Sequence, residues 1–131
     1  MENRSESRKK IMTILYQISI YEKNKIEYNV DNVIKEVSII DNEFIKDTVY
    51  GVITYKEKID EIANSYLNNW TIDRLGNTDA AILRMGIYEL EYTDIPPVIA
   101  INEAVELAKL YSDDAVKKMI NAALDGLYHL K

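Results

Sequence analysis

The sequence has no cysteine, one histidine and two prolines among its 131 residues. Without cysteine, disulfides, thiolate metal sites and thiol nucleophiles are excluded. The histidine, His129, lies two residues from the C-terminus, where we expect an exposed side chain rather than part of a Ser-His-Asp triad or a metal site. The four glycines are far apart, so there is no glycine-rich phosphate loop. We therefore expect no enzyme, no cofactor, no metal and no small-molecule substrate.

Long apolar runs are also missing, since none approaches the roughly 18 residues of a membrane helix. The N-terminus has no apolar segment of the signal-peptide kind, and we expect a cytoplasmic protein. The net charge of −6 argues against a protein that coats nucleic acid, because lysine and arginine supply most sequence-independent affinity. Positive charge is nevertheless concentrated near both ends of the chain, in residues 4–10 and at Lys117 and Lys118. RNA binding, if present, is therefore local.

Apolar residues recur at helical spacing along the whole chain, which predicts an all-α protein. We expect two small helical bundles that share one long helix, in a single domain of residues 1–131 with halves of about 1–70 and 71–131. The expected helices cover residues 5–21, 30–40, 41–69, 79–92 and about 113–130, and a further helix starts at Pro96 and Pro97 and carries an apolar stripe from Ile101 to Tyr111. The β-branched residues of 30–40 also suit a strand. Asp41 is the expected N-cap of the long helix, and Asn77 or Thr78 that of the next.

The helix over residues 79–92 carries apolar or small residues on every face, as expected of a helix surrounded by others. Gly51 and Gly86 are expected to permit close helix packing. Arg84 interrupts the apolar surface, so it must be paired or emerge at an edge. The favoured interpretation is a structural ion pair, with Glu103 or Asp79 as candidate partners, or a clamp on backbone carbonyls that joins the two halves, and contact with a partner is the alternative.

Three segments in this half of the chain carry a family resemblance: residues 79–91, then Asp94-Ile95-Pro96, then residues 100–109. Together they closely resemble the NusB family of bacterial transcription antitermination factors. Weaker matches occur at Arg8 with residues 15–17, at residues 49–52 and 59–60, and at Trp70 with residues 74–75. The resemblance therefore covers nearly the whole chain.

This resemblance implies a non-enzymatic adaptor that binds the ribosomal protein NusE and single-stranded boxA RNA. Such an adaptor acts indirectly on the RNA polymerase elongation complex and promotes elongation through ribosomal RNA operons. Two alternatives stay open. One is a helical protein-interaction domain that has lost RNA binding. The other is the RNA-binding module of a ribosomal RNA methyltransferase, although the chain has neither a methyl-donor-binding βαβ segment nor a catalytic cysteine.

The resemblance also implies positions for both surfaces. The expected RNA-binding residues are Arg4, Arg8, Lys9, Lys10, Tyr16, Lys117, Lys118 and Asn121. Tyr16 is equally compatible with a half-buried core position. Met119 and Ala122 replace an aromatic residue and a glycine of the family pattern, which weakens the case for RNA contact by the last helix. The expected NusE-binding residues are Arg74, Asp79, Ile82 and Arg84.

Overall fold

The computed structural model describes residues 2–129, and every regular element in that range is helical. The elements are α1 (Arg4–Lys23), α2 (Val30–Val37), α3 (Glu43–Thr54), α4 (Lys56–Tyr66), the short 3-10 helix η1 (Ile72–Arg74), α5 (Asn77–Tyr92), α6 (Pro97–Tyr111) and α7 (Asp114–His129). The all-α prediction is confirmed, and the alternative of a strand over residues 30–40 is wrong because Val30–Val37 is helical. Leu130, at the end of the last expected helix, lies outside the described residues.

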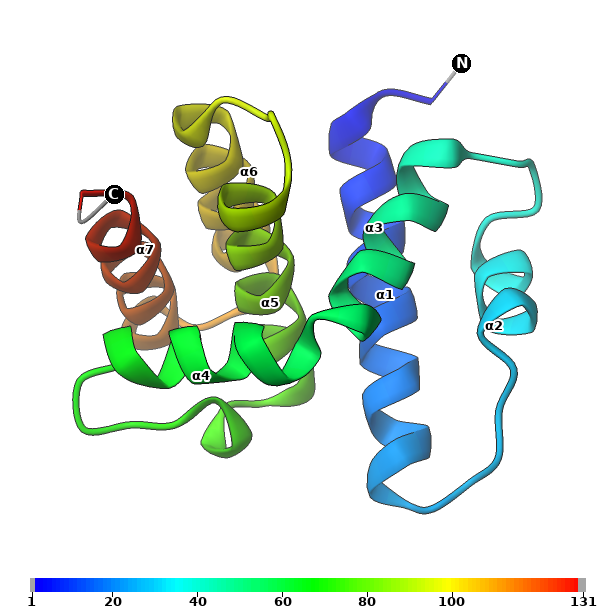
Figure 1. The fold of residues 1–131 in the computed structure, drawn as a ribbon, viewed down its shortest axis with the longest axis horizontal. Helices are drawn as coiled ribbons and strands as arrows, with labels where there is room; N and C mark the ends of the chain where they lie inside the picture. Colours follow the sequence, from blue (N-terminus) through cyan, green and yellow to red (C-terminus); the bar gives the residue numbers. More distant parts are fainter. Residues whose placement is uncertain (1, 130–131) are drawn as a thin grey trace.

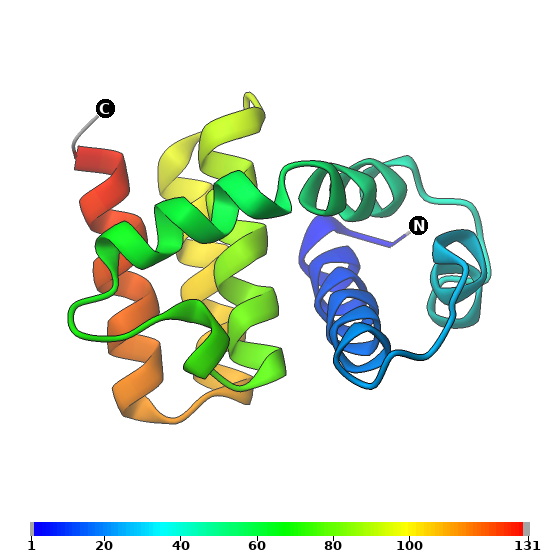
Figure 2. The same cartoon turned by 60° about the horizontal axis from the view of Figure 1, so that its bottom comes forward.

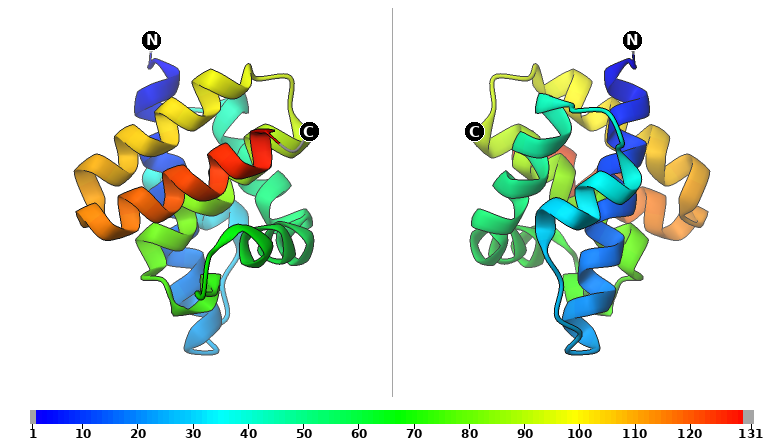
Figure 3. Two further views of the ribbon diagram at one scale, coloured as in Figure 1. Left: turned by 90° about the vertical axis from the view of Figure 1, so that its left-hand side faces the viewer. Right: turned by 90° about the vertical axis from the view of Figure 1, so that its right-hand side faces the viewer.

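The helices form two groups, with α1 to α3 on one side and α4 to α7 on the other (Figure 1). In the second group α5, α6 and α7 lie side by side with alternating direction, and α4 crosses them (Figure 2). In the first group α2 packs on α1, across from the other bundle (Figure 3). Of the helices among residues 2–129, none has the length and apolar character needed to cross a membrane.

The single long helix expected over residues 41–69 is wrong, because it is divided at Tyr55. The Tyr55 N–H still bonds to the carbonyl of Gly51, and its own carbonyl accepts from the N–H of Ile59. One residue therefore ends α3 and begins α4, and the axis turns there (Figure 1). The Tyr55 ring stacks on Tyr92 of α5, with centroids 4.1 Å apart.

Helix ends differ from expectation by small shifts. The N-cap of α3 is Asn42 rather than Asp41, and its side-chain oxygen accepts from the N–H of Ile45 at 3.1 Å. The helix α5 begins after Gly76 without a side-chain cap, so neither Asn77 nor Thr78 has the expected role. Pro97 occupies the first turn of α6, where its missing N–H leaves no bond unmade.

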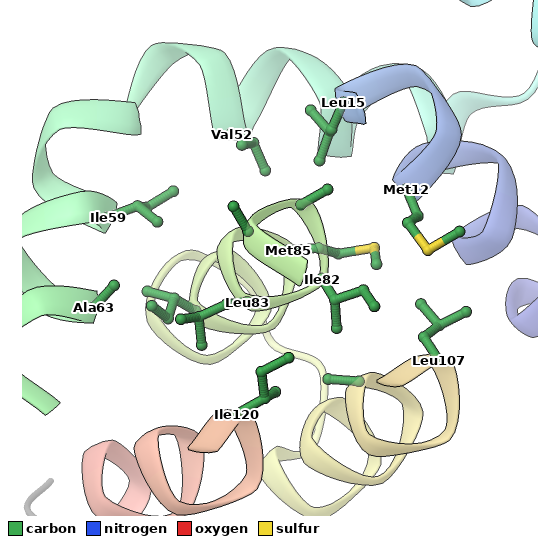
Figure 4. Close-up of a cluster of buried hydrophobic side chains, with 14 of the residues drawn as sticks. Met12, Leu15, Val52, Ile59, Ala63, Ile82, Leu83, Met85, Leu107 and Ile120 are labelled. Atoms are coloured by element: carbon green, nitrogen blue, oxygen red, sulfur yellow. The ribbon is translucent and has the colours of Figure 1, made fainter. Parts of the chain in front are cut away.

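The helix α5 is the centre of the core, as its all-round apolar sequence predicts. It contacts α1, α3, α4, α6 and α7. Figure 4 shows side chains from these helices around it, among them Leu15 from α1, Ile59 from α4 and Ile120 from α7. Gly86 permits this approach, since a Cβ there would lie 2.9 Å from a methyl of Leu124. The prediction of close packing at Gly86 is confirmed.

We expect Leu83→Ala to lower the free energy of unfolding by about 2 to 5 kcal/mol, because Leu83 is fully buried at the centre of the core. Chemical denaturation measures the change. Leu110→Ala is the matched control, since Leu110 is 62% exposed and its truncation leaves no cavity. Equal losses for the two variants would contradict the central position of α5.

Candidate nucleic-acid and protein interfaces

Arg8 lies inside the protein, where it joins three helices. Its side chain is 3% exposed, and its Nε and Nη2 donate to the two carboxylate oxygens of Glu89 on α5, both at 2.9 Å. Its Nη1 donates to Glu103 of α6 at 3.1 Å. Because all three nitrogens are engaged internally, the expectation that Arg8 contacts RNA phosphates does not hold in this structure. The fork of the guanidinium matches a carboxylate in two bonds, which suits arginine to this position.

The other basic residues of the first turns are accessible to different degrees. Arg4 is exposed, and its guanidinium lies 4.5 Å over the ring of Phe44. Lys10 forms an ion pair with Glu2 at 2.6 Å, and the pKa of Glu2 is lowered by hydrogen bonds from Lys10 and Ser7. Lys9 is exposed and has no ion pair among the described residues. The chain therefore offers an N-terminal basic surface made of Arg4, Lys9 and Lys10.

Tyr16 extends this surface along α1. It is 37% exposed, so part of its ring is open to solvent. It follows Lys9 by seven residues, which is close to two helical turns, and the two side chains therefore lie on the same face of α1. An exposed aromatic ring in line with a cation is a combination that holds an unstacked base and its phosphate.

The candidates on α7 lie elsewhere. Lys118 and Asn121 are exposed, whereas Lys117 faces Asp114 at 3.9 Å. The carboxylate of Asp113 accepts from the N–H of Val116 at the start of the helix, so negative charge surrounds this site. Figures 1 and 3 show the start of α7 away from the start of α1. The structure does not bring the two basic groups together into one patch.

Of the four residues expected to bind NusE, one is buried and one is held in an ion pair within the chain. Ile82 is fully buried in the core, so its expected contact with a partner does not hold in this structure. Arg84 forms a structural ion pair, as the favoured interpretation predicts, but with Asp60 of α4, at 2.8 and 3.2 Å, and not with Glu103 or Asp79. Asp60 lies beside α5 because α4 crosses it, a placement that depends on the turn at Tyr55.

The other two residues are accessible. Arg74 is exposed on η1 and lies 4.1 Å over the ring of Trp70. Asp79, in the first turn of α5, is partly exposed and accepts a hydrogen bond from the hydroxyl of Ser112, at the end of α6. Arg74 and Asp79 therefore remain as a polar surface around the start of α5.

Sequence reasoning misses Glu89 as a structural residue, because carboxylates on helices usually lie on solvated faces. It is 1% exposed. A feature of the sequence could have identified it. Glu89 interrupts the same apolar helix as Arg84, so its charge also needs a partner. Among residues 2–129 no three histidine or carboxylate side chains lie close enough to hold a metal ion.

A model of the NusB family matches residues 5–129. The chain belongs to the NusB family. It is 36% identical over 129 residues to the transcription antitermination protein NusB of Bacillus pumilus, covering 95% of this chain and 93% of that one. It is 38% identical to NusB of Campylobacter jejuni strain 81-176, covering 100% and 99%.

The solved structure of a relative has the same fold. The crystal structure of the antitermination factors NusB and NusE in complex with double-stranded RNA superposes on this NusB-family chain with a TM-score of 0.83. The two are 27% identical, and the match covers 98% of this chain and 97% of that one. The arrangement of α1 to α7 is therefore that of the family.

We expect Arg8→Met to lower the free energy of unfolding by about 3 to 5 kcal/mol, because it leaves the carboxylate of Glu89 buried without its cation. Urea denaturation at neutral pH measures the loss. Lys9→Met is the control, and its exposed position predicts a change within about 0.5 kcal/mol. Adding Glu89→Met to Arg8→Met should restore part of the stability. A loss below about 1 kcal/mol for Arg8→Met would show that the pair is dispensable.

Proposed function

We propose that this chain is a non-enzymatic antitermination adaptor that binds boxA RNA and NusE and acts in the bacterial cytoplasm, where nascent transcripts are made. The observation that carries the proposal is the family match over residues 5–129, together with the fold shared with a NusB that was crystallised with NusE and RNA. The relatives named as antitermination proteins have nearly the length of this chain.

The proposed RNA surface is the exposed face of α1. Lys9 and Tyr16 share that face and Lys10 lies next to Lys9, whereas Arg4 lies at the start of the helix on the side of Arg8, over the ring of Phe44. Lys118 and Asn121 of α7 form a second, separate contact in this proposal. Phosphate contacts from lysine and arginine fix the register of the strand, while the ring of Tyr16 holds a base. With few free cations on a chain of charge −6, the complex with NusE is expected to bind RNA better than the chain alone.

The proposed NusE surface is the start of α5 with the turn before it. Asp79 and Arg74 offer opposite charges on neighbouring elements, and the hydroxyl of Ser112 orients the Asp79 carboxylate. Charged groups of this kind set partner choice and association rate at a protein interface.

Replacing Arg4, Lys9 and Lys10 by alanine should weaken binding of the NusE complex to boxA RNA and flatten its salt dependence. The slope of log affinity against log salt should fall by about 0.7 for each phosphate of a single strand that the variant no longer neutralises. Titration of labelled RNA at several salt concentrations measures both quantities. The control is Lys35→Ala with Lys58→Ala, which removes exposed lysines from α2 and α4. An unchanged slope would remove α1 from the RNA site and favour a family member that has lost RNA binding.

Tyr16→Leu separates stacking from charge in the same assay. It should weaken RNA binding by about 1 to 3 kcal/mol, the value of one base stacked on an aromatic ring, while the salt slope stays that of the unaltered protein. A parallel fall in slope would show that the substitution disturbs α1 as a whole.

Asp79→Lys should weaken NusE binding by about 2 kcal/mol or more, because it removes one charge of an interface and leaves its partner unpaired. Calorimetric titration with NusE measures the loss, while direct binding of RNA to the variant should persist. The control is Glu61→Lys on the exposed side of α4, which makes the same change of charge outside the proposed NusE surface. Equal effects of the two variants would place the NusE surface elsewhere.

A further inference from the structure

A groove of about 500 Å³ is lined by residues of α3, of the end of α5 and of the connection from α5 to α6, and it adjoins the N-terminal basic surface at Arg4. Aromatic and apolar side chains line part of it, namely Phe44 of α3, Tyr88 of α5 and the pair Ile95 and Pro96. Arg4 also lines it, with its guanidinium over the ring of Phe44. The wall of the groove thus already holds one guanidinium of the chain itself by a cation–π contact.

Three carboxylates line the same groove. Glu43 and Asp47 come from α3, and Asp94 comes from the connection after α5. Within residues 2–129 none of the three forms an ion pair, and none accepts a hydrogen bond through its side chain. Burial raises the pKa of Tyr88, and the Asp47 carboxylate adds to the rise, so negative potential reaches the phenol from this side. Three carboxylates without an ion pair beside aromatic rings, with Arg4 as the one cation among the groove's lining residues, are a favourable environment for a further cation.

Thr48 gives an independent indication that the groove receives a polar group. Its side chain is 3% exposed and lines the groove. Its hydroxyl has no hydrogen-bond partner in the part of the chain that the structure describes, in contrast to the hydroxyl of Thr13, which donates to a helix carbonyl. The oxygen is not sealed from solvent either, so it opens into the groove. A nearly buried polar group is normally satisfied, and a ligand in the groove would satisfy this one.

We propose that this groove binds an arginine-bearing segment of a protein partner, with one guanidinium between the carboxylates of Glu43, Asp47 and Asp94 and an apolar neighbour against Ile95 and Phe44. The occupant follows from charge complementarity. A guanidinium has five donors for the carboxylate oxygens and the hydroxyl of Thr48, and its flat face stacks on aromatic rings. RNA is disfavoured here because its phosphates would meet three unpaired carboxylates. The groove therefore adds a protein contact beyond those of the adaptor function, and it holds or fails independently of that function.

The test is a titration of the ¹⁵N-labelled full chain, followed by NMR, with the tripeptide acetyl-arginyl-leucyl-arginine amide. The backbone amides of Thr48, Tyr88 and Ile95 should shift on binding. A matched tripeptide with citrulline in place of arginine keeps the shape but not the charge. It should bind at least about tenfold more weakly, the factor that corresponds to one charge-assisted hydrogen bond.

Variants distinguish binding of the peptide in the groove from nonspecific attraction of a cationic peptide to an acidic protein. Glu43→Gln with Asp47→Asn and Asp94→Asn should weaken the arginine peptide about tenfold or more, and Thr48→Val should weaken it further without changing net charge. The control, Glu36→Gln with Glu57→Gln and Glu61→Gln, removes the same charge from exposed positions on α2 and α4 and should change affinity less than twofold. Equal binding of the citrulline peptide, equal loss in the control, or shifts confined to other residues would each overturn the proposal.

Discussion

The buried ion pair of Arg8 with Glu89 and Glu103 is the interaction on which the arrangement of the two helix groups depends. It joins the first helix of one group to two helices of the other, and the other polar side-chain bonds between these helices, Ser5 with Glu103 and Lys23 with Asn77, lie at exposed positions. This pair restricts how α1 can pack, because any rotation of α1 about its axis would leave the Arg8 guanidinium or its carboxylate partners buried without an opposite charge. The pair therefore sets which face of α1 points outward. Lys9 and Tyr16 reach solvent together because Arg8 points inward.

This constraint also organises the surface by charge. With Arg8 internal, the exposed cations of α1 are few, and the carboxylates of α3 and of the α5 to α6 connection form no ion pair around their groove. Arg4 stands between the two regions, since it belongs to the basic first turn and also lines the groove through Phe44. A protein of net charge −6 thus carries exposed basic groups and carboxylates without an ion pair on neighbouring helices.

Helical periodicity is enough to predict the fold class, the central position of α5 and the role of Gly86, since all three follow from local spacing and side-chain size. The division of the long helix is less visible. Its signal is a gap in the apolar stripe between Val52 and Ile59, where charged residues 56–58 occupy the next turn. The site residues are harder to predict because the pattern of cations does not reveal which one is buried. Arg8 and Lys9 are adjacent in sequence. Helical spacing puts Arg8 in line with Ile11, Leu15 and Ile18, but the carboxylate that allows its burial, Glu89, lies on another helix and is not revealed by the sequence of α1.

Tyr55 has a consequence for how the chain tolerates changes in length. Because it belongs to the hydrogen bonding of both α3 and α4, there is no spacer residue at this corner. Inserting or deleting one residue would turn α4 by about 100° relative to α3 and carry Ile59 and Ala63 away from α5. The loops before α2 and α3 do not fix the rotation of the helix that follows in this way, because each of these helices starts from its own asparagine N-cap. Those loops can therefore change in length without rotating the helices that follow, whereas the corner at Tyr55 cannot.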